Sequence, residues 1–304
     1  MNLEGCGTAL ITPFRHDGSL DEAALVAHVN WQIANGINLL IPCGTTGEAA
    51  TLSEQEWLRV IEVTVQTAAG RVPVFAGATH NATHQAVLNA KKLAGIDGLT
   101  GILTANPYYN KPGQEGQYQH FKAIAEAVDM PIMLYNIPGR TGTNLLPETI
   151  LRLAELKNIV AVKESSGNLV QITELLTQAP RSLRVFAGDD ALALPTIAVG
   201  GCGLISVASN AMPTLMSAMT NSAVHGDWIN ARRLNRQLFE FMQANFIEPS
   251  PAPIKTVLQL MGRSNGQLRL PMVPVSATTR RKLETVIGEL GQLQDRPDAR
   301  PRMF

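Results

Sequence analysis

The sequence predicts an α/β protein that folds as a (β/α)8 barrel with a C-terminal helical extension. Eight short runs of strand-forming residues recur at intervals of about 28 residues over the first two thirds of the chain, which is the length of one strand, one helix and two loops. Segments with helical periodicity separate these runs. Regular alternation of strand and helix predicts parallel strands, and eight such units close into a TIM barrel.

The predicted strands are apolar on both faces, as expected of parallel strands that are covered on both sides. They occupy residues 7–14, 37–43, 72–78, 98–104, 131–136, 159–163, 184–188 and 203–209. An open doubly wound sheet is the alternative, but the chain contains neither a GxGxxG nor a GxxxxGK[ST] fingerprint.

The intervening segments carry helix signals. Leu25, Val29 and Ile33 recur every four residues before a glycine, and Ser53 and Glu56 have the spacing of a capping box. After about residue 210 the strand signal ends, and residues 212–225, 228–245, 252–261 and 278–290 are predicted to be helical. We therefore expect a catalytic barrel over residues 1–226, a helical region over 227–294 and a disordered tail over 295–304.

Composition restricts the class of protein. Among 304 residues, 25 Lys and Arg balance 25 Asp and Glu, so a nucleic acid or an anionic membrane surface is not expected as a partner. A neutral chain also favours self-association. The three cysteines lie far apart without a CxxC motif, and no signal peptide or apolar run of membrane-spanning length is present. These features predict a cytoplasmic protein.

Lys163 is the strongest single indication of chemistry. The active face of a (β/α)8 barrel lies at the carboxyl ends of its strands. Of the eight lysines in the chain, only Lys163 ends a predicted strand. Burial favours the neutral amine of a lysine, and a neutral amine attacks carbonyl groups to form Schiff bases. The alternative is a structural lysine paired with an acid such as Glu48 or Glu164.

Other polar groups follow neighbouring strands. Tyr135 ends the fifth strand and could move protons between an amine and a carbonyl oxygen, or could simply be an interior aromatic residue. The loop at 44–48 offers the hydroxyls of Thr45 and Thr46 and backbone N–H groups suited to a small carboxylate, although many such loops are only turns. Arg140 lies in a loop and has the geometry to bind a carboxylate, unless it is merely a solvated cation.

A metal site is a weaker alternative. His80 and His84 have the i, i+4 spacing of helical metal ligands, and Asp189 and Asp190 form an acidic pair. No HExxH motif accompanies the histidines, and an aspartate before a helix is usually its N-cap.

In their order and spacing, six motifs resemble the dihydrodipicolinate synthase / N-acetylneuraminate lyase family of pyruvate-dependent class I aldolases, over about residues 4–292. They are 44–48 (GTTGE), 106–112 (NPYYNKP), 134–142 (LYNIPGRTG), 162–167 (VKESSG), 187–190 (AGDD) and 203–206 (GLIS). The adjacent threonines, Tyr109 and Arg140 are similar to the dihydrodipicolinate synthase branch.

The resemblance implies a role for each group. Lys163 forms an imine with pyruvate, and the resulting enamine adds to aspartate semialdehyde in lysine and diaminopimelate biosynthesis. Thr45, Tyr109 and Tyr135 form a proton relay, with Tyr109 supplied by a neighbouring subunit of a homotetramer that is a dimer of dimers. Substrate-binding residues are Thr46, Arg140, Gly188 and the backbone at Ile205. Neither an organic cofactor nor a metal is needed.

Inhibition by lysine is expected to be weak or absent. Lysine-inhibited members of the family bind lysine at a subunit interface through a Ser, two His, an Asn, a Glu and a Tyr. Asn81 and Tyr108 are retained, but the other positions carry Ala49, Glu54, Trp57 and Gln85.

Three other functions remain open. The chain could be a class I aldolase of the same family that acts on a sugar-acid aldehyde, or a metal-dependent pyruvate aldolase using His80 and Asp189. It could also be a non-catalytic pyruvate-binding barrel.

Overall fold

A computed structural model describes residues 3–294, and it contains the eight predicted strands. They are β1 Gly5–Ala9, β2 Leu39–Ile41, β3 Phe75–Gly77, β4 Gly101–Ala105, β5 Ile132–Asn136, β6 Ile159–Glu164, β7 Arg184–Ala187 and β8 Gly203–Ser206. All named strand pairs are parallel, in the order β2-β1-β8-β7-β6-β5-β4-β3.

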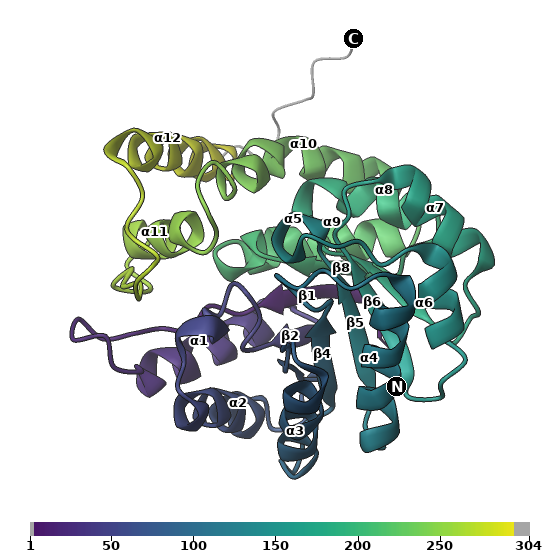
Figure 1. Ribbon diagram of the computed structural model, residues 1–304. Coiled ribbons are helices and arrows are strands. Elements are labelled where there is room, and N and C mark those ends of the chain that lie inside the picture. The colour runs from purple at the N-terminus through teal and green to yellow at the C-terminus, as the bar shows by residue number, and fades with distance from the viewer. Residues whose placement is uncertain (1–2, 295–304) are drawn as a thin grey trace.

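A parallel bridge between Leu40 and Val74 joins the first and last strands of this order. The Leu40 N–H donates to the Pro73 carbonyl at 3.0 Å across the same seam. The sheet is therefore a closed barrel, and the doubly wound alternative is wrong. Figure 1 shows the strands at the centre with helices around them.

The first strand is the clearest difference from the predicted elements. We predicted a strand over 7–14, but β1 ends at Ala9. The Leu10 N–H still donates to the Ile41 carbonyl, whereas the Ile11 N–H donates to the Asn210 side chain at 3.0 Å. Pro13 then lacks an N–H. The apolar run continues because these residues are buried, not because they belong to the sheet.

Helices follow each strand of the barrel. Those of the outer layer are α1 Glu22–Ala34, α2 Glu54–Ala68, α3 Thr83–Ala94, α4 Gln114–Ala127, α6 Pro147–Leu153, α7 Leu169–Gln178, α8 Ala193–Ala198 and α9 Pro213–Val224. Short helical turns at the loops are η1 Ala49–Thr51, α5 Pro138–Thr141, η2 Asp190–Leu192 and η3 Ala208–Asn210. The predicted capping box is present at α2, where Ser53 and Glu56 bond each other's backbone N–H groups.

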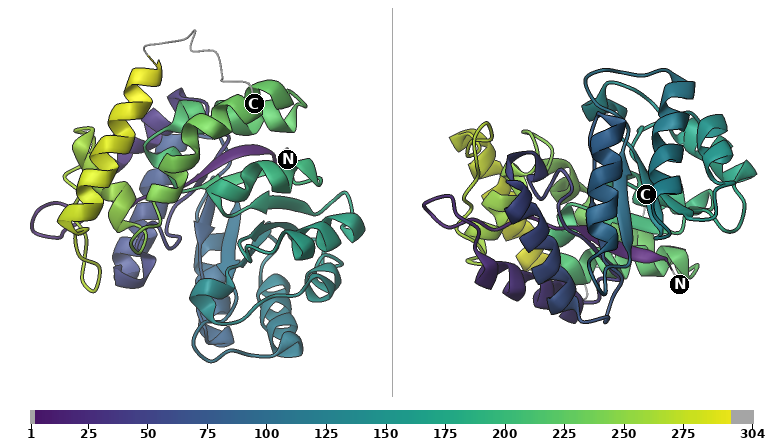
Figure 2. Two further views of the ribbon diagram at one scale, coloured as in Figure 1. Left: turned by 90° about the horizontal axis from the view of Figure 1, so that it is seen from above. Right: turned by 60° about the horizontal axis from the view of Figure 1, so that its bottom comes forward.

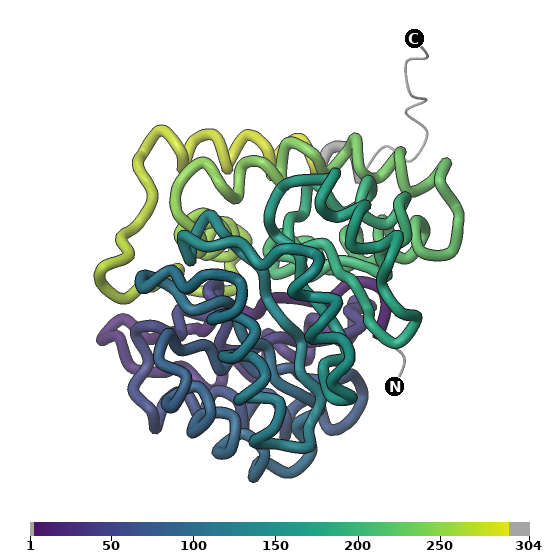
Figure 3. The backbone as a smooth tube through the Cα atoms, turned by 45° about the vertical axis from the view of Figure 1, so that its right-hand side comes forward, coloured from purple at the N-terminus to yellow at the C-terminus, as the bar shows by residue number. Residues whose placement is uncertain are grey.

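Three further helices form the C-terminal part of the described chain: α10 Trp228–Ala244, α11 Ala252–Leu260 and α12 Ala277–Gln294. They gather along one side of the molecule in both the ribbon and the tube (Figures 2 and 3). The division into a barrel at 1–226 and a helical region at 227–294 stays a prediction, and the predicted tail at 295–304 lies outside the described residues.

Apolar side chains form two cores, as the two faces of a barrel require. One fills the barrel interior and includes Ile41, Phe75, Met133 and Phe186. The larger one lies between strands and helices and includes Leu134, on the opposite face of β5 from Met133. Among residues 3–294, no helix is long and apolar enough to cross a membrane.

Candidate active site

Lys163 lies where the sequence predicts a reactive lysine, near the carboxyl end of β6. Its side chain is only 4% exposed. Lys163 is paired in register with Tyr135 on β5, and its Nζ lies 4.3 Å from the centroid of the Tyr135 ring. Parallel pairing of two strand ends therefore brings together two groups that are 28 positions apart in the sequence.

The two acids that could have paired with Lys163 are engaged elsewhere. Glu48 forms an ion pair with Lys255. Glu164 accepts hydrogen bonds from the Asn136 side chain at 2.9 Å and the Ser166 backbone at 2.6 Å, and burial raises the pKa of its carboxyl. Within residues 3–294, no carboxylate forms an ion pair with Lys163. The structural alternative for this lysine is therefore not supported.

A small cavity of about 50 Å³ contains the predicted groups. Lys163, Tyr135, Thr45, Thr46, Arg140 and Gly188 all line it. Apolar side chains such as Ala9, Ile41, Leu103 and Val207 form the rest of its wall. This combination of a few convergent polar groups with apolar walls is typical of a site for a small organic ligand.

Gly188 leaves the space that the Lys163 side chain occupies. A Cβ at position 188 would lie 2.9 Å from Cγ and 3.1 Å from Cε of Lys163, and 1.8 Å from Oγ of Ser165. The structure gives this glycine a packing role beside the buried Lys163 side chain.

A larger cavity of about 470 Å³ adjoins the small one. Arg140, Gly188, Ile137, Phe246 and Ser250 line both. The Arg140 Nη2 donates to the Ser250 carbonyl at 3.4 Å, which places the guanidinium at the junction of the two cavities. Any anionic ligand that entered from the larger cavity would meet Arg140 on its path to Lys163.

The threonine loop presents its two hydroxyls differently. The Thr46 side chain is buried, and Thr45 is exposed in the single chain. Among the described residues, no hydrogen bond joins Thr45 to Tyr135 or to Tyr109. The predicted proton relay is therefore not assembled within one chain.

Tyr109 does not line either cavity of its own chain. It is 88% exposed and has a φ of 73°, a conformation that only a constrained loop imposes on a tyrosine. Its N–H donates to the Thr141 carbonyl at 3.4 Å, next to Arg140. Ile205 is fully buried on β8 and contributes to the barrel interior.

The groups considered for a metal do not converge. His80 accepts a hydrogen bond from the Ala82 N–H at 3.0 Å, while Asp189 lines the larger cavity and caps η2 through Ala191. Within the described residues, no group of three or more His, Cys, Asp or Glu is placed to hold a metal ion.

Sequence reasoning missed two contributions to the site. Residues 246–250, between α10 and α11, line the larger cavity although they belong to the C-terminal region, and Phe246 and Ser250 also line the small one. Pro249 and Pro251 indicate an irregular segment but not its destination. The second is the role of Asp190, which the sequence offers only as half of an acidic pair. Its buried carboxylate accepts from the Ser206 hydroxyl and from the Val207 and Ala208 N–H groups at 3.1 and 3.2 Å, and Val207 lines the small cavity.

Comparison with known proteins decides the family. The model of the dihydrodipicolinate synthetase family matches residues 2–290. The chain belongs to this family. A relative from Acidobacterium capsulatum, named 4-hydroxy-tetrahydrodipicolinate synthase, is 60% identical over 298 residues, which are 98% of this chain and 99% of the relative.

Solved structures of dihydrodipicolinate synthases agree with this assignment. The enzyme from Aquifex aeolicus is 41% identical, with a TM-score of 0.92 over 95% of this chain and 98% of its own. The chloride-inhibited enzyme from Acinetobacter baumannii, solved with pyruvate, is 38% identical, with a TM-score of 0.93 over 95% of this chain and 99% of its own. The predicted family and the predicted TIM barrel are confirmed, and the chain is a lyase of the dihydrodipicolinate synthetase family.

Proposed function

We propose that this chain uses Lys163 to condense pyruvate with L-aspartate 4-semialdehyde through a Schiff base. The overall activity is that of a 4-hydroxy-tetrahydrodipicolinate synthase in lysine and diaminopimelate biosynthesis, the activity named for its full-length relatives. The observation that carries the assignment of Lys163 is its burial at a strand end, against Tyr135 and without a carboxylate partner among the described residues.

The first half of the reaction activates pyruvate. The Lys163 amine adds to the ketone carbon, and loss of water gives an imine. Loss of a proton from the pyruvate methyl group then gives an enamine, with the protonated imine nitrogen as the electron sink. In this proposal the Tyr135 hydroxyl moves protons at the carbinolamine stage, and the contact of its ring with Nζ supports that role.

The second half forms a carbon–carbon bond. The enamine carbon attacks the aldehyde of aspartate semialdehyde, and the aldehyde oxygen takes a proton. The amine of that substrate then attacks the imine carbon, displaces Lys163 and closes the ring, so the only other product is the water lost earlier. Arg140, at the junction of the two cavities, binds the carboxylate of the second substrate.

The remaining site residues have supporting roles in this proposal. Thr46 and the backbone at Ile205 bind pyruvate, and Gly188 borders it. Thr45 and Tyr109 complete a proton relay with Tyr135. The exposed position of Tyr109, away from its own cavity, supports a contribution to a neighbouring subunit of a homotetramer. A cytoplasmic location belongs to the same proposal, because all three cysteines are free.

Trapping of the imine tests the proposal. Incubation with pyruvate followed by borohydride reduction should add a stable mass to Lys163, located by peptide mass spectrometry, and Lys163→Met should lose both the adduct and turnover. An unmodified Lys163 in active enzyme would rule out this mechanism. Parallel assays with aspartate semialdehyde and with sugar-acid aldehydes should give turnover with the first alone.

A further inference from the structure

Glu48 closes the threonine loop but turns away from the active-site cavity. It follows Thr45 by three positions and Thr46 by two, and it does not line either cavity. Its backbone is left-handed, with a φ of 53°, and its N–H donates to the Thr45 carbonyl at 3.0 Å. The position of this residue therefore fixes the end of the turn that carries both hydroxyls.

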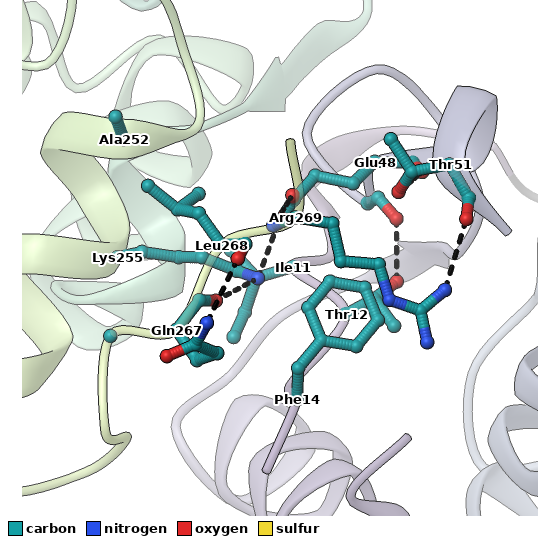
Figure 4. A network of polar contacts seen from close by, with 12 residues as sticks. Ile11, Thr12, Phe14, Glu48, Thr51, Ala252, Lys255, Gln267, Leu268 and Arg269 are labelled. Carbon is teal, nitrogen blue, oxygen red and sulfur yellow. Dashed lines mark hydrogen bonds and ion pairs between the residues drawn. The ribbon is translucent and has the colours of Figure 1, made fainter. Parts of the chain in front are cut away.

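Lys255 of α11 reaches the Glu48 carboxylate from the C-terminal region. The two side chains are 1% and 2% exposed and form a buried ion pair. The Lys255 ammonium also donates to the Gln267 carbonyl at 2.9 Å and lies 4.3 Å from the centroid of the Phe14 ring. Figure 4 shows Lys255 extending from its helix to the loop.

The second oxygen of Glu48 is bound as well. It accepts from the backbone N–H of Arg269 at 3.1 Å. The guanidinium of Arg269 donates to the Thr51 carbonyl at 3.0 Å and lies 4.2 Å from the centroid of the Phe14 ring (Figure 4). Phe14 is the same ring that the Lys255 ammonium contacts. Residues 255–269 therefore hold both ends of the 48–51 segment.

The rest of the turn leaves little freedom for an alternative position. The Gly47 carbonyl accepts from the Thr12 hydroxyl at 2.6 Å, and a Cβ at Gly47 would lie 3.1 Å from the Leu10 carbonyl oxygen. On the side of Leu10 and Thr12 the turn is held by this packing. On the side of the C-terminal region it is held by the polar contacts of the Glu48 carboxylate. Loss of those contacts would free the end of the turn at Glu48, two positions after Thr46, and would allow the Thr45 and Thr46 hydroxyls to move.

We propose that Glu48 and Lys255 are positioning residues, whose buried ion pair lets the C-terminal helical region hold the Thr45–Thr46 hydroxyls in their productive place for pyruvate. The inference rests on the proposed function of those threonines. It gives α11 a role in the reaction although its lysine touches no substrate. It also explains a buried pair of charges whose desolvation cost would otherwise be uncompensated by function.

The test replaces both charges together. Glu48→Gln combined with Lys255→Met keeps the side-chain volumes and leaves no uncompensated buried charge, so the double variant should fold with a Tm close to that of the wild type. Its KM for pyruvate should rise roughly tenfold to a hundredfold, and the pyruvate concentration for half-maximal borohydride trapping should rise in parallel. The KM for aspartate semialdehyde should change far less.

A matched control removes a different ion pair of the C-terminal helices. Lys282 pairs with Glu240 on the exposed surface, and Lys282→Met should leave both pyruvate measurements unchanged. An unchanged pyruvate KM in the folded double variant would overturn the positioning role, and failure of that variant to fold would assign the pair to stability alone. Absence of an adduct at Lys163 in the wild type would instead contradict the proposed function.

Discussion

A methyl group at position 188 would lie 2.9 Å from Cγ of Lys163, closer than side-chain carbons approach one another in folded proteins. The same methyl group would lie 1.8 Å from Oγ of Ser165, but a serine hydroxyl can rotate away. Cγ lies near the base of the lysine side chain, so Gly188→Ala should displace Lys163 from its contact with Tyr135. We expect a loss in kcat/KM of roughly a hundredfold, because an ångström-scale displacement of a reacting group costs about that much. Steady-state assays and borohydride trapping measure it.

Gly139 provides the control for this substitution. It lines the larger cavity, and a Cβ built there would meet no described atom within 4 Å beyond its chain neighbours and the backbone of its own helical turn. Gly139→Ala should retain wild-type trapping at Lys163. Equal losses in the two variants would show that the effect does not come from contact with the lysine.

Tyr135→Phe separates the ring of this tyrosine from its hydroxyl. The phenyl ring would keep the contact at 4.3 Å with the Lys163 amine, so the fold and the cavity should be preserved. Loss of proton transfer should lower kcat by about a hundredfold to ten-thousandfold. Tyr118→Phe is the control, because Tyr118 stacks against Arg152 outside both cavities. A Tyr135→Phe enzyme with normal kcat would remove the tyrosine from the proposed relay.

Arg140→Gln tests the assignment of the second substrate. Charge-assisted hydrogen bonds contribute about 1.5–3 kcal/mol, so the KM for aspartate semialdehyde should rise roughly tenfold to a hundredfold. Pyruvate trapping at Lys163 should still occur, because the first half of the reaction needs no second carboxylate. Arg233→Gln, on the exposed face of α10, controls for loss of a positive charge. Impaired trapping of pyruvate together with a normal KM for aspartate semialdehyde would instead assign Arg140 to the binding of pyruvate.

The sequence predicted the barrel and the cluster at its carboxyl ends because both depend on local signals. Strand-forming runs that recur at a regular interval and are apolar on both faces indicate parallel β-strands. Polar residues at the carboxyl ends of such strands then lie at the same rim of the barrel. Lys163 and Tyr135 could be placed together on this basis alone.

Contacts with the C-terminal region could not be predicted in the same way. The sequence offers Glu48 as a partner for Lys163, and only the fold shows that its partner is Lys255, 207 positions away in the sequence. Residues 246–250 reach the cavity through a loop whose path depends on how α10 packs. Such placements follow from tertiary packing, which has no local periodicity.

Lysine should inhibit this enzyme weakly or not at all. Trp57 occupies a position where lysine-inhibited relatives carry a polar ligand, and its indole N–H already donates to the Gly77 carbonyl at 2.8 Å. Glu54 is paired with Lys92, and Gln85 donates to Asn89. Because neither histidine is present and Gln85 replaces the glutamate, millimolar lysine should leave the initial rate nearly unchanged. Inhibition at low micromolar lysine would contradict the prediction.

Asp190 should make the stability of the protein depend on pH. Burial raises its pKa from 3.8 to about 6, against the opposing effect of the hydrogen bonds from Ser206, Val207 and Ala208. The neutral acid is therefore favoured in the folded chain relative to the unfolded one. Between about pH 4 and pH 6 the unfolded chain loses this proton first, so the folded state binds more protons and its stability falls as pH rises.

Asp190→Asn should remove this contribution. Across the same window the free energy of unfolding of the wild type should fall by about 3 kcal/mol relative to the variant, and the difference should be constant above about pH 7. Urea denaturation at several pH values measures it. Asp17 provides the control because it is exposed and the Ser19 hydroxyl lowers its pKa, so Asp17→Asn should give the opposite sign, if any. Parallel pH profiles for wild type and Asp190→Asn would contradict the prediction, because they would mean that Asp190 has the same pKa in the folded and the unfolded chain.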